Sequence, residues 1–213
     1  DVGGGRGDLG VAVSSRFPGA IVTVLDRNKQ SLGAGEEYSK SIGRSGAMNF
    51  VEADFLSFVE GDVDLASDLP PVDVVLALHA CGDLTDLVLE YARRINVPFI
   101  VCPCCFNKRW LAARGFTPRW YQFCVDENVS VLQRLAESEV RSVSFRSMKI
   151  INSMRIHAES AQSPPNDRCE IIRTRSNEKI DETKNDSRHY TITLEQYPSY
   201  FSLRNIVLIK GNF

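Results

Sequence analysis

Apolar residues occur in two alternating patterns over roughly the first half of this chain. Short continuous apolar runs, typical of strands buried on both faces of a parallel sheet, cover residues 21–25, 49–53, 72–78 and 99–102. Helical spacing of apolar residues, or a capping residue, predicts helices over residues 9–17, 28–42 and 86–94. The alternation favours an α/β fold, with a mostly parallel sheet and helices on both faces.

The second half of the chain has a different pattern. Residues 128–157 carry apolar side chains at roughly helical spacing, which predicts one long helix or a broken pair. Residues 158–189 have mixed charge, two prolines and few apolar side chains, so we expect a mobile insertion there. Two apolar runs, at 190–194 and 206–210, predict a C-terminal antiparallel hairpin at the edge of the sheet.

Length and composition indicate one globular domain that spans residues 1–213. The formal net charge of −2 and the pI near 6.0 give no support for unspecific polyanion binding. No apolar run is long enough to cross a bilayer and no signal peptide is visible, so we expect no membrane partner. The six cysteines lie mostly in apolar strand contexts, which fits reduced thiols and an intracellular location in the cytoplasm or nucleus.

The chain opens on a glycine-rich segment, DVGGGRGDLG, with glycine at every second position from Gly3 to Gly7. Glycine tolerates positive φ and has no side chain, so such a loop turns tightly and lets a ligand lie against bare backbone. The helix expected to begin near Asp8 would direct its amide end at the same place. Because such a loop normally follows a buried strand, we expect the domain to be truncated at its N-terminus.

Polar or reactive residues are expected where the strands end. The carboxyl ends of parallel strands lie along one edge of a sheet, and ligands of such sheets bind there. The residues that fall at these ends are Asp1, Asp26, Asp54, His79 and Cys104. We therefore expect the sheet to gather them along one rim, next to the glycine loop.

Two kinds of ligand fit the glycine loop. The segment GRGDLG has the GxGxxG spacing of a dinucleotide site, with Asp26 about 20 residues further on. An acid directly before the glycines would repel a pyrophosphate, whereas it suits a ligand with an ammonium group. S-adenosylmethionine carries an ammonium and a sulfonium, so Asp1 fits the ammonium, Asp26 the ribose hydroxyls and Asp54 the adenine amino group. A nicotinamide or flavin cofactor and a structural turn are the alternatives, and Asp54 alone is also explained as a helix cap.

Three further segments, LHACGDLTD at 78–86, CPCC at 102–105 and YFSLRN at 200–205, carry a resemblance to a known family. With the glycine loop, they resemble class I S-adenosylmethionine-dependent methyltransferases. The branch they resemble contains tRNA 2′-O-methyltransferases, the methyltransferase-like 25 proteins and the glutathione S-transferase C-terminal-domain-containing proteins. The resemblance implies a Rossmann-like seven-stranded sheet. It also implies a cofactor pocket formed by Asp1, Gly3, Gly5, Gly7, Asp26, Arg27, Asp54 and Phe55.

His79 and Asp83 are the candidate catalytic residues. Methyl transfer is an in-line displacement, and a general base is useful only where the acceptor must lose a proton. His79, at the end of the third apolar run, is placed where it could deprotonate or orient an acceptor hydroxyl, although a histidine at a strand end is often structural. Asp83 would orient the imidazole or, as the favoured interpretation, cap the next helix.

The cysteines allow three interpretations. Cys81, Cys102, Cys104 and Cys105 could approach one another and bind zinc, but CPCC lacks the usual paired spacing, so no metal is expected. Cys104 after Pro103 resembles the proline–cysteine pair of RNA enzymes in which a thiolate attacks a base. The favoured interpretation is that these thiols are small apolar packing groups.

A segment after the fourth apolar run, residues 107–123, interleaves basic and aromatic side chains. Basic groups hold phosphates and aromatic faces stack bases, so this segment is the best candidate for contact with a nucleic acid. A solvated helix with its aromatic residues in the core explains the pattern equally well. The residues assigned to the substrate are Cys104, Asn107, Lys108 and Arg109.

We expect a methyltransferase that acts on a macromolecule, with RNA favoured over protein as the partner. The alternatives are a domain that binds S-adenosylmethionine without turnover and a methyltransferase of small molecules.

Overall fold

The computed structural model describes residues 1–60, 70–124, 126–160, 191–196 and 206–211. Its strands are β1 (Val22–Asp26), β2 (Met48–Glu52), β3 (Val75–Ala80), β4 (Phe99–Pro103), β5 (Thr191–Gln196) and β6 (Ile206–Gly211). Its α-helices are α1 (Asp8–Arg16), α2 (Lys29–Ser41), α3 (Phe55–Glu60), α5 (Asp83–Arg94), α6 (Asp126–Ala136) and α7 (Arg141–Ser160). Three 3₁₀ turns are η1 (Ser45–Ala47), η2 (Ala112–Arg114) and η3 (Arg119–Phe123).

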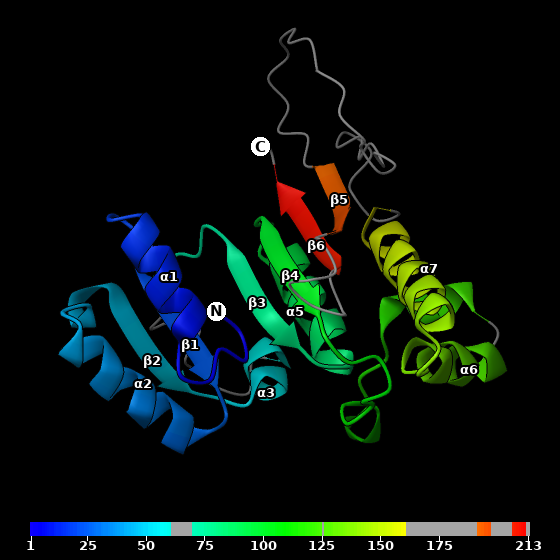
Figure 1. Cartoon of the computed structure of the whole chain (residues 1–213), viewed down its shortest axis with the longest axis horizontal. Helices are drawn as coiled ribbons and strands as arrows, with labels where there is room; N and C mark the ends of the chain where they lie inside the picture. The colour runs from blue at the N-terminus through cyan, green and yellow to red at the C-terminus, as the bar shows by residue number, and fades with distance from the viewer. Residues whose placement is uncertain (61–69, 125, 161–190, 197–205, 212–213) are drawn as a thin grey trace, which may run out of the picture.

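The strands form two sheets (Figure 1). In the first sheet β1 and β2 are parallel, with Val24 opposite Phe50. The second sheet has the order β3-β4-β6-β5, in which β3 and β4 are parallel and β6 is antiparallel to both of its neighbours. The antiparallel pair β5 and β6 confirms the C-terminal hairpin, and the parallel strands confirm the α/β class.

The first residues of the chain join the two sheets. Val2 forms a parallel bridge with Leu25 of β1, and its N–H donates to the carbonyl of Leu76 in β3 over 2.8 Å. On the β1 side, the N–H of Leu25 donates to Asp1 over 2.9 Å and that of Gly3 donates to Leu25 over 2.8 Å. The order across the molecule is therefore β2-β1-Val2-β3-β4-β6-β5, and the direction of winding reverses at Val2.

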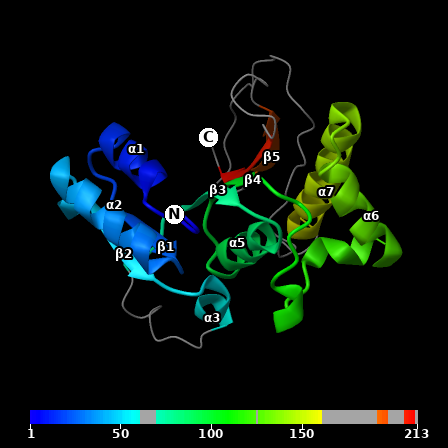
Figure 2. The same cartoon turned by 60° about the horizontal axis from the view of Figure 1, so that its bottom comes forward.

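Helices cover both faces of this arrangement, as the sequence predicts (Figures 1 and 2). Successive residues of a strand point to opposite faces. Val24 of β1 packs in a cluster with Leu32 of α2 and with residues of α1, whereas its neighbour Leu25 packs with Phe55 of α3 and Leu87 of α5. The face with α1 and α2 and the face with α3 and α5 are therefore buried separately.

Of the two alternatives for residues 128–157, one long helix or a broken pair, the structure has the pair, α6 and α7. These helices form a second apolar cluster around Trp120, which is 1% exposed. Arg155 of α7 reaches α5 and makes two 2.8 Å hydrogen bonds to the carboxylate of Asp86. A buried, bidentate ion pair is costly to break by removing one partner, so this contact fixes α7 against α5.

Several sequence expectations change. The single seven-stranded sheet is replaced, in the described part of the chain, by six strands in two sheets joined at Val2. The expected insertion overlaps α7, which continues through Ser160, and residues 161–189 lie outside the described residues. The segment YFSLRN at 200–205, which carries part of the family resemblance, also lies outside the described residues. No helix of the described residues has the length and apolar character to cross a membrane.

Two glycines of α2 provide a matched test of how this helix packs. A Cβ added at Gly35 would clash with the carbonyl oxygen of Arg6, whereas one added at Gly33 would meet nothing within 4 Å. We expect Gly35→Ala to lower the free energy of unfolding by about 1–3 kcal/mol through overpacking. Gly33→Ala should raise it by about 0.5–1 kcal/mol, because alanine favours the helix. Urea denaturation of both variants checks this, and equal effects would contradict the packing of α2 on the loop.

Candidate functional site

The glycine loop occupies the point where the winding of the strands reverses. Gly3, Gly5 and Gly7 have φ of 67°, 55° and 78°, a region that side chains other than glycine rarely adopt. Gly7 precedes the first residue of α1, and its N–H donates to Gly4 over 2.8 Å. In open α/β sheets, ligands bind at such a reversal, outside the carboxyl ends of the strands.

A cleft of about 250 Å³ lies at this place. It is bounded by the glycine loop and by the residues that follow β1, β2, β3 and β4. The residues that line it are Val2, Gly3, Leu25, Asp26, Arg27, Ala53, Asp54, Phe55, Cys81, Leu84, Lys108 and Trp110. Five of the eight residues expected at the cofactor are among them, so most of the predicted pocket converges on one cavity.

Asp26, at the end of β1, accepts hydrogen bonds from two turns beside the cleft. Its Oδ2 accepts a 2.9 Å hydrogen bond from the N–H of Gly5, and its Oδ1 accepts one of 2.8 Å from the N–H of Asn28. Asn28 in turn caps α2 by accepting from the N–H of Ser31 over 3.1 Å. An ionised carboxylate has about four acceptor positions, so Asp26 retains capacity for two donors such as vicinal hydroxyls.

Asp54, after β2, is already engaged by other residues. Both of its carboxylate oxygens accept from Nη1 of Arg114 over 2.8 Å, and Oδ1 also accepts from the N–H of Ser57 over 3.2 Å. Burial raises the pKa of Asp54, but the hydrogen bonds from Arg114 and Ser57 outweigh it, so the net pKa is lowered. The alternative that Asp54 caps a helix is confirmed for α3, while its proposed contact with an adenine stays a prediction.

The start of α5 holds the segment that closes the other side of the cleft. The N–H of Asp83 donates to the carbonyl of Lys108 over 3.0 Å, and its Oδ2 accepts from the N–H of Leu111 over 3.2 Å. These bonds fix Lys108 and Trp110 at the cleft, where the guanidinium of Arg27 lies 5.2 Å from the Trp110 ring centre. The interpretation that Asp83 caps this helix is wrong, because the N-cap of α5 is Gly82 and no side-chain cap hydrogen bond forms there. Asp83 is the first residue of α5, and its buried carboxylate positions the segment around Leu111 instead. An orienting role toward His79 stays a prediction.

Asp1 lies beneath the glycine loop and does not line the cleft. A Cβ on Gly4 would lie 2.5 Å from Oδ2 of Asp1, so the carboxylate packs directly against the loop. Both of its oxygens are buried, and neither has a hydrogen-bond partner among the described residues. Asp1 is among the residues that line the groove on the amino-terminal side of the strands, so its expected contact with a ligand ammonium stays a prediction.

His79 is exposed and is not among the residues that line the cleft. The register of β3 against β4 shifts between Ala77 and Ala80, which places an extra residue in β3. Such a bulge redirects side chains, and both Leu78 and His79 are exposed there. No pattern in the sequence indicates this bulge. The residue of the segment LHACGDLTD after β3 that lines the cleft together with Leu84 is Cys81.

Of the residues predicted to contact the substrate, some lie at the cleft and others lie away from it. Lys108 lines the cleft, and Asn107 and Arg109 are exposed beside it. Arg109 turns toward α6, where its Nη1 donates to Ser130 over 3.2 Å. Trp120 is fully buried, so it belongs to the core and offers no surface for stacking. Cys104 contacts Cys81 rather than lining the cleft.

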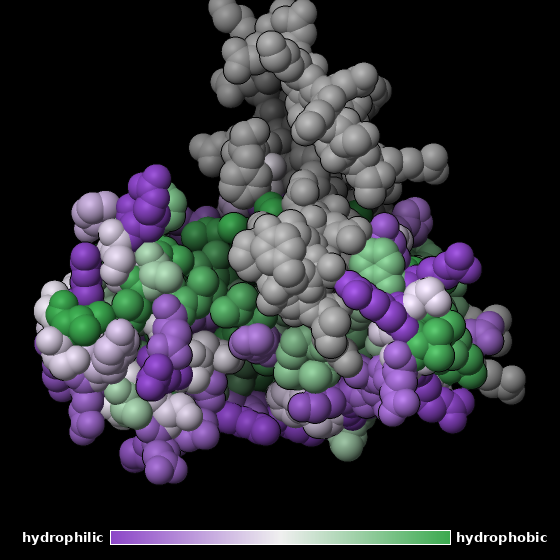
Figure 3. All heavy atoms as spheres, in the orientation of Figure 1, coloured by the Kyte–Doolittle hydropathy of each residue, from purple (hydrophilic) through white to green (hydrophobic). Residues whose placement is uncertain are grey.

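An apolar groove lies on the amino-terminal side of the same strands. It has a volume of about 380 Å³ and is lined by Val22 and Thr23 of β1 and by Val75 and Leu76 of β3, among others. Figure 3 shows apolar side chains gathered in the hollow between α1 and the four-stranded sheet. The groove lies away from the loops that follow the strands, so we assign the polar ligand to the cleft instead.

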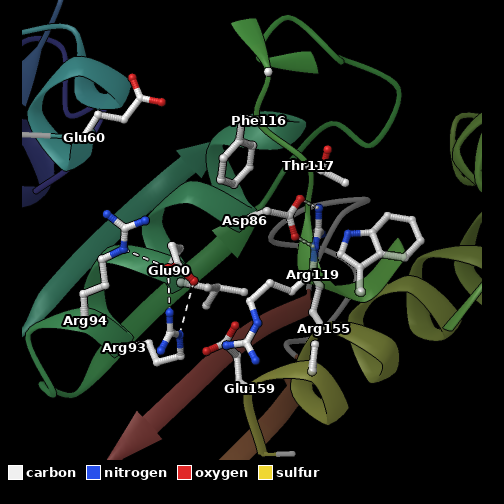
Figure 4. Close-up of a pocket in the computed structure, with 14 residues that line it drawn as sticks. Glu60, Asp86, Glu90, Arg93, Arg94, Phe116, Thr117, Arg119, Arg155 and Glu159 are labelled. Atoms are coloured by element: carbon white, nitrogen blue, oxygen red, sulfur yellow. Dashed lines mark hydrogen bonds and ion pairs between the residues drawn. The ribbon is translucent and has the colours of Figure 1, made fainter. Parts of the chain in front are cut away.

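A third cavity, of about 300 Å³, lies between α5, α7 and the segment before η3 (Figure 4). It shares no lining residue with the cleft. Acidic and basic side chains alternate around it, and the ion pair of Asp86 with Arg155 forms part of its wall. Burial raises the pKa of Glu159 in this wall to about 6. Because the acidic and basic side chains of this wall offset one another, we assign them to holding α5 and α7 together.

A family described as a methyltransferase domain (Methyltransf_32) matches residues 1–109. The glutathione S-transferase C-terminal domain-containing protein of Homo sapiens is 26% identical over 103 residues, which cover 48% of this chain and 14% of that protein. Its homologue in Drosophila melanogaster is 28% identical over 103 residues, covering 48% of this chain and 16% of the homologue. The chain thus matches only a small part of the length of these relatives.

Among solved structures, the plantazolicin methyltransferase BpumL in complex with a pentazolic desmethylPZN analogue and SAH matches this chain with a TM-score of 0.46. The two are 11% identical, and the match covers 100% of this chain and 76% of BpumL.

The buried carboxyl of Asp83 predicts a pH dependence of stability. Burial and the charge of Asp86 raise the pKa of Asp83 to about 6 in the folded protein, compared with about 3.9 in an unfolded chain. The folded state therefore binds the proton of the Asp83 carboxyl more tightly than the unfolded state does. The stabilisation from this protonation is lost as the pH rises from about 4 to about 6. We expect Asp83→Asn to flatten the decline in stability over this range, measured by urea denaturation. The exposed Asp8→Asn is the control, and an unchanged slope in Asp83→Asn would contradict the assignment.

Proposed function

Because this chain belongs to the Methyltransf_32 family of class I S-adenosylmethionine-dependent methyltransferases, we propose that it methylates a macromolecule, with RNA favoured over protein. One observation carries the proposal: the glycine loop and the ends of four parallel strands meet around one cleft. The cleft has acidic groups on the β1 and β2 side, and a basic and an aromatic group on the β4 side.

The residues of the cleft suit the donor. S-adenosylmethionine supplies an electrophilic methyl group on a sulfonium when it is bound. Asp26 is placed to accept from ribose hydroxyls while its hydrogen bond to Gly5 keeps the loop in shape. Phe55 lines the cleft beside Asp54, and its ring is buried against Phe58 and Tyr91, which fixes the backbone after β2 at the cleft. Positioning of donor and acceptor, with water excluded, supplies much of the acceleration of an in-line methyl transfer.

The side of the cleft formed by residues 107–110 supports a nucleic-acid acceptor. Lys108 is exposed and lines the cleft, and Trp110 lines it with the guanidinium of Arg27 over its ring. Arg109, the next residue after Lys108, is exposed beside the cleft and donates to Ser130 of α6. Basic groups at the rim can hold phosphates, and the ring can stack on a base. The favoured acceptor is therefore a structured or single-stranded RNA that presents one nucleotide to the cleft.

A domain that binds the donor without turnover is the second candidate. It is favoured by the exposed position of His79 outside the cleft, which leaves no histidine among the lining residues. Binding of the demethylated product together with no transfer to any acceptor fraction would support this alternative.

The donor site is tested with two aspartates near the loop. Asp26 accepts from the loop at the cleft, whereas Asp8 is exposed and pairs with Arg6. Hydrogen bonds to charged groups contribute about 1.5–3 kcal/mol, so we expect Asp26→Ala to weaken S-adenosylhomocysteine binding about 10- to 100-fold. Isothermal titration calorimetry measures this, with Asp8→Ala as the control. Similar affinity in both variants would contradict the assignment of the cleft.

The acceptor class is tested by transfer of labelled methyl groups from S-adenosylmethionine to separated RNA and protein fractions. We expect label in RNA, and a rate that falls as salt rises, because phosphate contacts release counterions. The double substitution Lys108→Ala, Arg109→Ala should lower transfer and make its salt dependence shallower. Lys40→Ala, at the exposed far end of α2, is the control. Label confined to protein, or no difference between the two variants, would overturn the RNA assignment.

A further inference from the structure

Three thiols converge beside the cleft, on two neighbouring strand ends. The sulfur atoms of Cys81, Cys104 and Cys105 all lie within 4.8 Å of one another. Cys102, which precedes them in CPCC, is not part of this group. We propose that Cys81, Cys104 and Cys105 form a three-thiolate site for a soft divalent cation, with Zn²⁺ as its occupant.

The pairing of β3 with β4 brings these residues together. Ala80 pairs with Pro103, so the next residues, Cys81 and Cys104, lie side by side at the ends of adjacent parallel strands. The N–H of Gly82 then donates to the carbonyl of Cys105 over 2.7 Å, which extends the contact by one residue. The three thiols converge because of the register between β3 and β4. The spacing of the cysteines within CPCC therefore does not reveal the cluster.

Gly82 makes this close approach possible. It has a φ of 59°, and a Cβ added to it would clash with the carbonyl oxygen of Lys108. Any larger residue at this position would push the segment of residues 105–108 away from the end of β3. The sequence Cys81-Gly82 therefore brings a thiol and a close backbone contact to the same point.

One pair of sulfur atoms already has the separation of a zinc site. The sulfur atoms of Cys104 and Cys105 are 3.8 Å apart, and two thiolates on one tetrahedral zinc, with Zn–S bonds of about 2.3 Å, are separated by about 3.8 Å. Those of Cys81 and Cys104 are 2.6 Å apart, so one of these side chains would rotate outward to admit the ion. All three residues are half-buried rather than sealed in the core, which leaves a path of entry.

Two other observations favour a cation. Three thiols are one more than a disulfide needs, and a Cys81–Cys104 bond would leave Cys105 without a role. Lys108 lines the adjoining cleft, where its positive charge would offset the net negative charge of three thiolates on one divalent ion. Three protein ligands leave the fourth position of a tetrahedral ion open to a water or another small ligand.

The test uses the purified, reduced and metal-stripped chain. Titration with Zn²⁺ against a chromophoric chelator should show one tight site per chain, and Cd²⁺ should give the ultraviolet charge-transfer band of cadmium thiolates. Cys81→Ser, Cys104→Ser and Cys105→Ser should each weaken binding at least about tenfold, since even residues that only support metal ligands cost about that much. Cys102→Ser, on the same strand, is the matched control and should bind as the parent chain does.

A second measurement covers variants that fold poorly. In the parent chain, Zn²⁺ should protect Cys81, Cys104 and Cys105 from alkylation by iodoacetamide and leave the reactivity of Cys102 unchanged, as read by mass spectrometry. Absence of a stoichiometric site, equal loss in Cys102→Ser, or a Cys81–Cys104 disulfide in a chain that retains no zinc would each overturn the proposal. Binding of S-adenosylhomocysteine, measured in parallel, separates this result from the assignment of the donor cleft, because the thiolate site does not depend on methyl transfer.

Discussion

The backbone hydrogen bonds of Val2 hold the two sheets in one arrangement. On one side Val2 bridges to Leu25 of β1, and on the other its N–H donates to Leu76 of β3. The glycine loop begins directly after it, so the loop is fixed at the place where β1 and β3 diverge. This short connection sets β1 beside β3, and the pairing of β2 with β1 and of β4 with β3 places the other strand ends at the cleft.

Around that connection, the cleft is built from loops that hold one another. The carboxylate of Asp26 accepts from Gly5 and so connects the glycine loop to the turn before α2. Asp54, at the start of α3, accepts from Arg114. The first residues of α5 form hydrogen bonds with the segment of residues 105–111. Each carboxylate therefore has a structural partner before any ligand arrives. Such preorganisation reduces the entropy lost when a ligand binds, which suits a site that must position a donor and an acceptor with little error.

The strand ends could be predicted because buried parallel strands are short apolar runs that stop at polar residues. This pattern predicts Asp26 and Asp54, whereas the glycine loop follows from the spacing of its glycines and the cap at Asn28 from its residue type. The bulge that exposes His79 depends on the register between β3 and β4, which a local pattern does not specify. The contact between Cys81 and Cys104 depends on the same register. The burial of Trp120 depends on tertiary packing, which a local pattern does not specify either.

The central claim, that the methyl donor occupies the cleft beside Val2 and the glycine loop, is tested most directly by hydrogen–deuterium exchange with and without S-adenosylhomocysteine. The account predicts slower exchange in the peptides that contain residues 3–7, 26–28, 54–57 and 108–111, because a bound ligand restrains these loops and shields their amides from solvent. Protection confined to α5 and α7 around Glu159, or no change at saturating ligand, would contradict it.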